Sequence, residues 1–271
     1  MKYSLVNRDD RISIELTDQF RELAAQLGMT EDRESPDVVL SIGGDGTLLH
    51  AFHLFIDKLD EISFVGIHTG HLGFFADWKP DEIELLAKLM SGPKKGYERR
   101  IVKYPLAEMQ IHTKSGTEVH YALNEFTVKG AEATLVARLD INDETFEMFR
   151  GDGICISTPA GSTAYNKSLG GAIIHPSLET IQIAEIASIN NRVFRTLGSS
   201  IILPRHHHCD IYPKTHQKIQ LFIDHLQVVH DDIQSIRCRV ADKRVSFARF
   251  RPFPFWTRVK EAFINSDKPQ P

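Results

Sequence analysis

The sequence predicts a two-part protein, with an α/β domain at the N-terminus followed by an all-β, sandwich-like domain. Over the first hundred residues, apolar runs typical of strands alternate with runs that have helical spacing. Strands and helices in alternation predict βαβ units and a parallel, Rossmann-like sheet. From about residue 97 the sequence alternates apolar and polar residues with few helical runs, which predicts short antiparallel strands.

The first part begins with an expected strand at residues 1–6 and an amphipathic helix that ends at Gly28. The β-branched run at residues 38–42 is almost continuously apolar, which is typical of a strand covered on both faces. The remaining expected elements are a helix over residues 48–59, a strand over 62–68 and a helix over 80–90 that is opened by a proline.

The second part contains a hairpin signal at residues 114–117, where polar residues and a glycine interrupt the alternation. A helical pattern with large apolar groups follows near the end of the chain, and residues 265–271 are expected to be disordered. We predict an α/β domain over residues 1–98, a β-rich domain over 99–250 and a C-terminal segment over 251–271. Further strands are expected at residues 135–141, 154–157, 181–188, 218–223, 227–230 and 235–240.

The composition is that of an ordinary globular protein. Of the 271 residues, 42% are hydrophobic and 25% charged, so the chain can bury a core without disulfides or a structural metal. The net charge of −4 argues against a nucleic-acid partner. No apolar run reaches the roughly 18 residues of a membrane helix, and the first residues lack the apolar core of a secretory signal. Three widely spaced cysteines favour a reducing compartment, and we expect the cytoplasm.

A glycine-rich loop, Gly43-Gly44-Asp45-Gly46-Thr47, follows the buried strand at residues 38–42. Such a turn, opening into a helix, aims several backbone N–H groups at one point and so favours a phosphate. Asp45 would repel that phosphate unless it has another task. It could hold Mg²⁺ against the phosphates or accept a proton from an attacking hydroxyl. The alternative is a plain strand-to-helix turn in which Asp45 caps the helix.

A second cluster of small and hydroxylated residues follows Gly151-Asp152-Gly153. Residues 157–166 combine serine, threonine, alanine and glycine with one aromatic ring, Tyr165, which suits a ligand that meets the backbone closely and stacks on a ring. Asn124-Glu125, at a predicted strand end, could bond the two hydroxyls of a ribose. Each segment alone also fits an ordinary loop or a solvated strand end.

Taken together, in this order and at these intervals, the glycine loop, Asn124-Glu125, Gly151-Asp152-Gly153 and residues 157–165 resemble the bacterial NAD kinase family. Residues 66–74 and 170–176 support the resemblance, which extends from about residue 38 to 256. The glycine loop alone is shared with lipid kinases and phosphofructokinases, whereas the whole set is specific. A lipid or sphingoid kinase would be expected to lack the downstream segments. A non-catalytic NAD(P)-binding regulator is disfavoured because Asp45 and both glycine loops are intact.

The resemblance implies that the chain phosphorylates the 2′-hydroxyl of the adenosine ribose of NAD to make NADP. The donor would be ATP or polyphosphate with a divalent metal, expected to be Mg²⁺, and the site would lie between the two domains. It implies that the C-terminal segment packs on the first domain and that the protein forms a homodimer or homotetramer. The charge and hydropathy of the chain predict neither a nucleic-acid nor a membrane partner. Asp45 would be the proton acceptor, and Gly43, Gly44, Gly46 and Thr47 would hold the donor phosphates. The residues implied to bind NAD are Gly46, Asn124, Glu125, Arg150, Asp152, Thr163, Ala164, Tyr165, Asn166, Lys167, Ser168, Ala187, Asp224 and His225.

Three consecutive histidines, His206-His207-His208, raise the question of a metal site. Adjacent residues of a strand point to opposite faces, so three neighbouring side chains do not converge easily on one ion. We therefore expect a solvated turn at this position.

Overall fold

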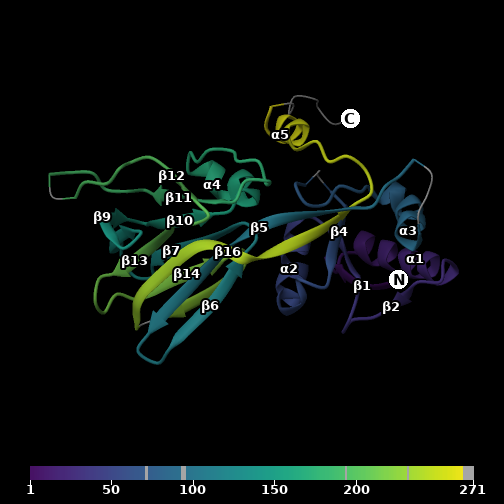
Figure 1. Ribbon diagram of the computed structural model, residues 1–271, viewed down its shortest axis with the longest axis horizontal. Coiled ribbons are helices and arrows are strands. Elements are labelled where there is room, and N and C mark those ends of the chain that lie inside the picture. Colours follow the sequence, from purple (N-terminus) through teal and green to yellow (C-terminus); the bar gives the residue numbers. More distant parts are fainter. Residues whose placement is uncertain (71–72, 93–95, 193, 231, 265–271) are drawn as a thin grey trace. The chain divides into compact units, whose positions relative to one another are not determined.

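A computed structural model describes residues 1–70, 73–92, 96–192, 194–230 and 232–264. The chain folds into two compact units, of which the first comprises Met1–Tyr104 with Val245–Pro271 and the second Pro105–Arg244 (Figure 1). The predicted division at residues 98 and 250 stays a prediction. The expected disorder of residues 265–271 falls outside the described residues.

The first unit is built on a parallel sheet. Its strands are β1 (Lys2–Asn7), β2 (Thr30–Glu31), β3 (Val38–Gly43) and β4 (Ser63–His68), in the order β2-β1-β3-β4. The end of β16 (Ile233–Arg249) continues the sheet in parallel beside β4. Because all these strands run in one direction, β1, β3 and β4 end at the same edge of the sheet.

Helices cover both faces of this sheet. Helix α1 (Arg11–Gln26) starts at Asp10, whose carboxylate accepts a 2.8 Å hydrogen bond from the Ser13 N–H, as expected of an N-cap. It packs with α3 (Ile83–Ser91) against alternate residues of β3, and the three form one apolar core. Helix α2 (Asp45–Leu54) lies on the opposite face (Figure 1). Two short 3₁₀ turns, Ile56–Lys58 and Pro80–Glu82, and α5 (Phe255–Phe263) complete the unit.

The second unit is a sandwich of antiparallel strands. One sheet has the order β12-β11-β10-β7-β14-β15, and β5, β6, β8, β9 and β13 belong with β16 to the other. Inward side chains of both sheets form one apolar core, so the outward face of β7, β10 and β11 is left for other contacts. The bounds are β5 Arg100–Thr113, β6 Thr117–Ala122, β7 Glu125–Gly130, β8 Leu135–Ile141, β9 Glu144–Gly151, β10 Gly153–Ser157, β11 Thr180–Ile186, β12 Ile201–Pro204, β13 His208–Pro213, β14 Ile219–Ile223 and β15 Leu226–His230, with η3 Ala160–Thr163 and α4 Tyr165–Ser168 after β10.

The predicted fold class, an α/β domain followed by an all-β domain, is confirmed. The helix after the glycine loop begins at Asp45 rather than at residue 48, and it ends at Leu54. Strands β2, β9, β12 and β13 were not predicted. Residues 144–148 of β9 are mostly exposed, so the apolar periodicity that reveals a buried strand is absent there.

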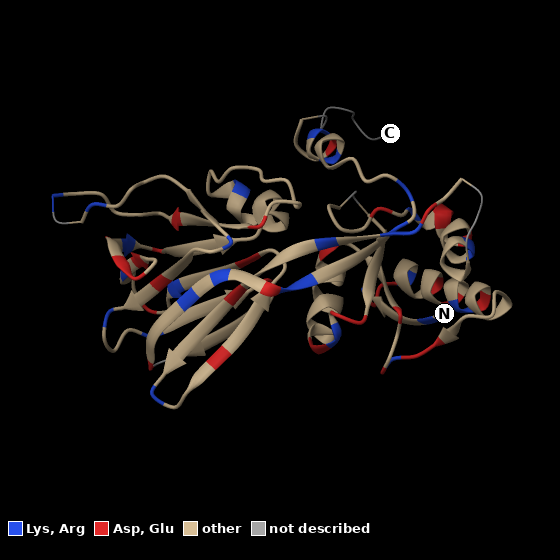
Figure 2. Cartoon of the chain, in the orientation of Figure 1, with Lys and Arg blue, Asp and Glu red and all other residues tan. Residues whose placement is uncertain are grey.

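The three cysteines, Cys155, Cys209 and Cys238, are free and buried. Over the described ranges, no helix is both long and apolar enough to span a membrane. Acidic and basic residues are interspersed on the helices and strands of both units (Figure 2).

Candidate active site

The predicted phosphate loop lies where β3 passes into α2. Gly44 is the extended N-cap residue of α2, and Asp45 is the first helical residue. A Cβ atom at Gly43 would lie 2.1 Å from Thr47 Oγ1, so this position requires glycine for packing. Added Cβ atoms at Gly44 and Gly46 would meet nothing within 4 Å. The loop is therefore open at Gly44 and Gly46, where the N-terminus of the helix favours an anion.

The carboxylate of Asp45 is held by three consecutive backbone N–H groups. Phe74 donates to Oδ2 at 2.7 Å, and Phe75 and Ala76 donate to Oδ1 at 3.0 and 3.4 Å. A Cβ atom at Gly73 would lie 2.1 Å from Oδ1, so the approach also depends on that glycine. Asp45 therefore does not cap its own helix, and the plain-turn alternative does not describe this loop.

These hydrogen bonds leave Asp45 with limited accepting capacity. An ionised carboxylate offers about four lone-pair positions, two on each oxygen. Oδ1 accepts two N–H groups and Oδ2 accepts one. A further proton donor is therefore best accommodated at Oδ2.

Two further residues lie near the loop: Arg8, which escaped the sequence reasoning, and His68, which the sequence reasoning took for a structural histidine. Arg8 directly follows β1, and its Cβ would be 3.2 Å from a Cβ at Gly43. His68 ends β4, pairs with Gly43 in the sheet register, and has Nδ1 3.0 Å from the Gly70 carbonyl oxygen. Both stand at the carboxyl edge of parallel strands, the usual place for a ligand, and that position could have identified them.

In the second unit, Asp224 fixes the backbone of the Asn-Glu pair. Its carboxylate accepts hydrogen bonds from the N–H groups of Leu123 at 3.0 Å, Asn124 at 2.7 Å and Glu125 at 3.2 Å. Asp224 sits in the turn between β14 and β15 with φ 53°, and the neighbouring His225 is exposed. Asp224 thus fixes the backbone of Asn124 and Glu125, although it lies about a hundred positions later in the sequence.

The side chain of Glu125 is mostly buried and faces this acidic neighbour. Burial is the main cause that raises the pKa of Glu125 to about 8, and the negative charge of Asp224 is the second. A hydrogen bond from the Tyr165 N–H lowers the pKa by a smaller amount. At neutral pH the carboxyl group is therefore largely protonated. Its Oε2 atom is buried and has no partner among the described residues. A ligand hydroxyl could supply one.

Most hydroxyl groups of the Ser/Thr-rich segment bond to the protein itself. Thr158 Oγ1 donates to the Leu123 carbonyl oxygen at 2.6 Å, and Ser162 Oγ donates to that of Pro159 at 2.7 Å. Thr163 Oγ1 donates to the Ala160 carbonyl oxygen at 3.1 Å. A Cβ at Gly161 would lie 2.1 Å from the Asn124 carbonyl oxygen. This segment therefore holds its own turn against Asn124.

The side chain of Tyr165 is partly buried and packs against the small apolar cluster that includes Cys155, on the outward face of β10. The Lys129 Nζ atom, which the sequence reasoning missed, lies 5.5 Å from the centre of the Tyr165 ring. The amide group of Asn166 is fully buried, with both polar atoms unpartnered among the described residues. Around it, Ala164 is partly buried, and Lys167 and Ser168 are exposed.

Arg150, Asp152 and Ala187 form a separate group at the other end of β10. The Asp152 N–H donates to the Ile186 carbonyl oxygen at 2.9 Å, and Ala187 has φ 46°. In the sheet register Gly153 pairs with Ile186, whereas Ser157 pairs with Glu125. Four residues at about 3.3 Å each separate the two groups by about 13 Å along the strand. The structure thus brings Asn124, Glu125, Asp224 and the 163–166 segment together, and sets Arg150, Asp152 and Ala187 apart.

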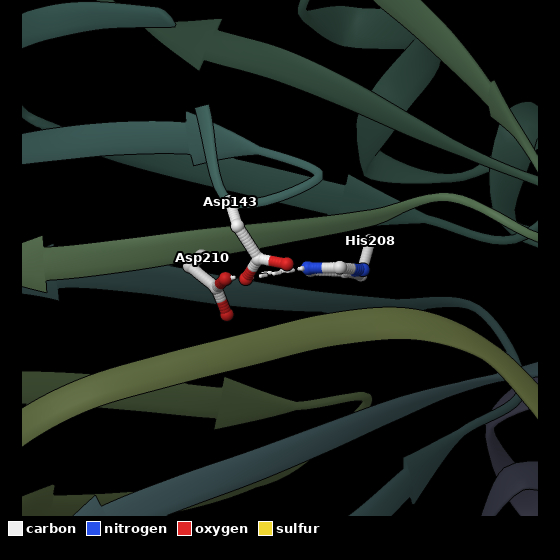
Figure 3. A group of neighbouring side chains, drawn as sticks. All are labelled: Asp143, His208 and Asp210. Atoms are coloured by element: carbon white, nitrogen blue, oxygen red, sulfur yellow. Dashed lines mark hydrogen bonds and ion pairs between the residues drawn. The ribbon is translucent and has the colours of Figure 1, made fainter. Parts of the chain in front are cut away.

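A possible metal-binding group lies in the second unit, where Asp143, His208 and Asp210 offer ligand atoms within 4.8 Å of one another (Figure 3). The guanidinium of Arg237 already donates hydrogen bonds to both carboxylates. Its Nε donates to Asp210 at 2.7 Å, and its Nη2 donates to Asp210 and to Asp143, both at 2.8 Å. These hydrogen bonds raise the pKa of Arg237. The group is an ion-pair network, because the guanidinium of Arg237 already binds both carboxylates.

Comparisons with known proteins identify the family of this chain. Residues 9–93 match the ATP-NAD kinase N-terminal domain, and residues 106–249 match the ATP-NAD kinase C-terminal domain. NAD kinase 1 of Bacillus cereus is 53% identical over 97% of this chain and 99% of its own length. NAD kinase 1 of Halalkalibacterium halodurans is 53% identical over 98% of this chain and 99% of its own.

Two solved structures share the fold. Yeast NADH kinase complexed with NADH has a TM-score of 0.79 at 18% identity, over 100% of this chain and 89% of that one. An NAD kinase from Archaeoglobus fulgidus in complex with ATP has a TM-score of 0.76 at 20% identity, over 96% of this chain and 98% of that one. With both family domains matched in order and full-length relatives at 53% identity, this chain belongs to the NAD kinase family.

Proposed function

We propose that this protein phosphorylates the 2′-hydroxyl of the adenosine ribose of NAD to give NADP, with ATP or another phosphoryl donor. The observation that carries the proposal is the fixed carboxylate of Asp45 beside an open phosphate loop. Membership of the NAD kinase family supports the reaction type.

Asp45 is the proton acceptor in this proposal. Phosphoryl transfer passes through a loose transition state, so positioning and charge stabilisation supply most of the rate. The substrate hydroxyl donates to Oδ2 of Asp45, its oxygen bonds to the terminal phosphorus, and the shortened donor departs. The loop residues Gly43, Gly44, Gly46 and Thr47 hold the donor phosphates. Support comes from the open space at Gly44 and Gly46 at the start of α2.

The residues around Asn124 bind the adenosine half of NAD. The buried, partnerless Oε2 atom of Glu125 and the amide of Asn166 supply polar contacts, and Tyr165 stacks on the adenine. Thr163, Ala164, Lys167, Ser168 and His225 line the same region, and Asp224 holds it in place.

Arg150, Asp152 and Ala187 contact the dinucleotide farther along, near the nicotinamide. Because they stand at the other end of β10, we propose that they serve a dinucleotide held by a second subunit of a homodimer or homotetramer. Asp152 and Ala187 are exposed, as such a contact requires.

A divalent metal, Mg²⁺, accompanies the donor in this proposal. No group of three or more ligand side chains surrounds Asp45 within the described parts of the chain, and Asp45 has most of its lone pairs occupied. The residues present therefore do not form a resident metal site. Mg²⁺ commonly binds through substrate phosphates and one or two carboxylates, so we propose that the ion arrives on the donor. The free, buried thiols support a reducing compartment, for which we propose the cytoplasm.

The test is direct. Purified protein is incubated with Mg²⁺, NAD and ATP, and NADP is detected through an NADP-dependent dehydrogenase. We expect NADP to accumulate. Absence of NADP, together with phosphorylation of a diacylglycerol or sphingoid base, would overturn the proposal. Parallel assays with NADH and with polyphosphate establish the preferred acceptor and donor.

A further inference from the structure

Three arginines, at the end of β16 and in the C-terminal segment after it, bind the backbone of residues 73–77, the loop that holds Asp45. Arg258 Nη1 donates to the Gly73 carbonyl oxygen at 2.8 Å, and Arg249 Nη1 donates to that of Phe75 at 3.2 Å. Arg251 donates to the Asp77 carbonyl oxygen. All of these residues belong to the first unit, in which basic residues recur from the end of β16 to α5 (Figure 2).

Two of these contacts reach Asp45 through a single peptide unit. In the weaker one, Arg249 binds the Phe75 carbonyl oxygen at 3.2 Å, and the Ala76 N–H of the same amide donates to Oδ1 at 3.4 Å. The stronger one starts at Arg258. The Gly73 carbonyl and the Phe74 N–H belong to the same planar amide. Arg258 binds the oxygen of this amide at 2.8 Å, and its N–H donates to Asp45 Oδ2 at 2.7 Å. A cation on the oxygen polarises the amide and makes its N–H a better donor. Arg258, the peptide and Asp45 thus form a hydrogen-bonded chain.

Helix α5 fixes Arg258 against this loop. The Phe74 ring lies 5.7 Å from that of Phe263 and 6.2 Å from that of Phe255, at the two ends of the helix. The Arg258 guanidinium stands 4.3 Å from the centre of the Phe253 ring. Arg258 is partly buried, and this burial lowers the pKa of its guanidinium and strengthens hydrogen bonds within the chain.

We propose that Arg258 is a positioning residue for phosphoryl transfer, acting on the Asp45 carboxylate through the Gly73–Phe74 peptide. The proposal rests on the function proposed above. It assigns a role in turnover to α5, whose described residues lie more than two hundred positions after Asp45 in the chain.

Arg251 provides a matched control. Its guanidinium also lies over a ring, 4.1 Å from the centre of Trp78, and it binds a carbonyl of the same loop. However, Arg251 contacts the peptide between Asp77 and Trp78. The Trp78 N–H of this peptide donates to the Gly66 carbonyl oxygen at 3.1 Å and not to Asp45. Arg251 therefore anchors the loop without contacting an amide that reaches the carboxylate.

The experiment compares Arg258→Met and Arg258→Lys with Arg251→Met and Arg251→Lys in the full-length protein. For each we measure kcat and KM for NAD and ATP, together with the thermal unfolding temperature. Loss of a hydrogen bond made to a charged group predicts a kcat about 10- to 100-fold lower in R258M, with KM values within about threefold of wild type. R258K, which keeps a cationic donor, should recover most of the kcat. Both Arg251 variants should retain kcat within about threefold, even where they unfold at lower temperature.

Each result supports or overturns the positioning role of Arg258. Equal kcat in the R258M and R251M proteins, or a loss confined to KM, would overturn the positioning role while the NAD kinase activity of the wild type stands. If R258M does not fold, Arg258→Gln and Arg251→Gln replace the two methionine variants, because glutamine also removes the charge. A kcat for R258Q no lower than that for R251Q would then overturn the role. An inactive wild type would instead overturn the proposed function, and this role with it.

Discussion

The backbone N–H of Phe74 donates a 2.7 Å hydrogen bond to Oδ2 of Asp45, across 29 positions of the sequence. Phe75 and Ala76 bond to the other oxygen of the same carboxylate. Three consecutive N–H groups directed at one point form the kind of concavity that binds anions, and here the anion is a side chain. The orientation of Asp45 is therefore fixed before any substrate binds.

Gly73→Ala tests this arrangement without altering Asp45 itself. The new Cβ would lie 2.1 Å from Oδ1, so either the carboxylate or the loop must move. A displacement of about 1 Å at a reacting group can cost about a hundredfold in rate, and we expect a loss of that order in kcat. Gly70→Ala is the control, because its Cβ would meet nothing within 4 Å. Wild-type kcat in the Gly73 variant would contradict the need for a fixed carboxylate.

Asp224→Asn tests the support of the Asn-Glu pair. Asparagine tolerates the left-handed conformation at φ 53°, so the backbone turn should survive. The amide cannot accept from all three N–H groups that the carboxylate binds. Weakening these bonds by about 1–2 kcal/mol predicts a KM for NAD raised about tenfold, with the KM for ATP nearly unchanged. Steady-state kinetics with each substrate varied separately measure both, and equal increases would contradict a role limited to the NAD side.

Glu125→Gln tests the raised pKa of the buried carboxyl group. Burial and Asp224 raise the pKa of Glu125 in the folded protein from 4.5 to about 8. Between these values the unfolded chain ionises this group while the folded protein does not, so wild type loses stability relative to the variant as pH rises from about 4.5 to 8. The unfolding temperature of Glu125→Gln minus that of wild type should therefore increase between pH 5 and pH 9, by about 2 °C or more.

The control for this measurement is Glu144→Gln, at an exposed position of the same unit. Its difference from wild type should vary much less with pH. A Glu125→Gln difference that is constant from pH 5 to pH 9 would show that the carboxyl group is not held in its protonated form.

The parts of the site that the sequence predicts are those encoded locally. Three glycines after an apolar strand predict the turn at Gly43, and the structure places it at the junction of β3 and α2. The helix begins three residues earlier than its apolar periodicity suggests, because Asp45 and Gly46 carry no apolar side chain to mark the first turn. Strand β8, in contrast, was predicted at its observed bounds because alternate buried residues reveal it.

The contacts that orient the site come from distant positions and could not be predicted from local pattern. Asp224 bonds to the backbone of Asn124 because β14 and β7 pair within one sheet. Phe74 bonds to Asp45 because β3 and β4 are neighbours and end at a common edge. Arg258 follows an aromatic-rich stretch that predicts packing but not the carbonyl that it binds. The separation of Arg150 from Glu125 likewise depends on the register of β10, which the residue types do not specify.

The role of Asp45 as proton acceptor is tested most directly by Asp45→Asn. We would measure kcat for NADP formation and, separately, the dissociation constant of NAD by calorimetry. Asparagine keeps the size of the side chain but cannot take up the proton of the 2′-hydroxyl. We predict that kcat falls about a thousandfold while the affinity for NAD stays within about threefold of wild type. A loss of equal size in kcat and in NAD affinity would contradict the assignment.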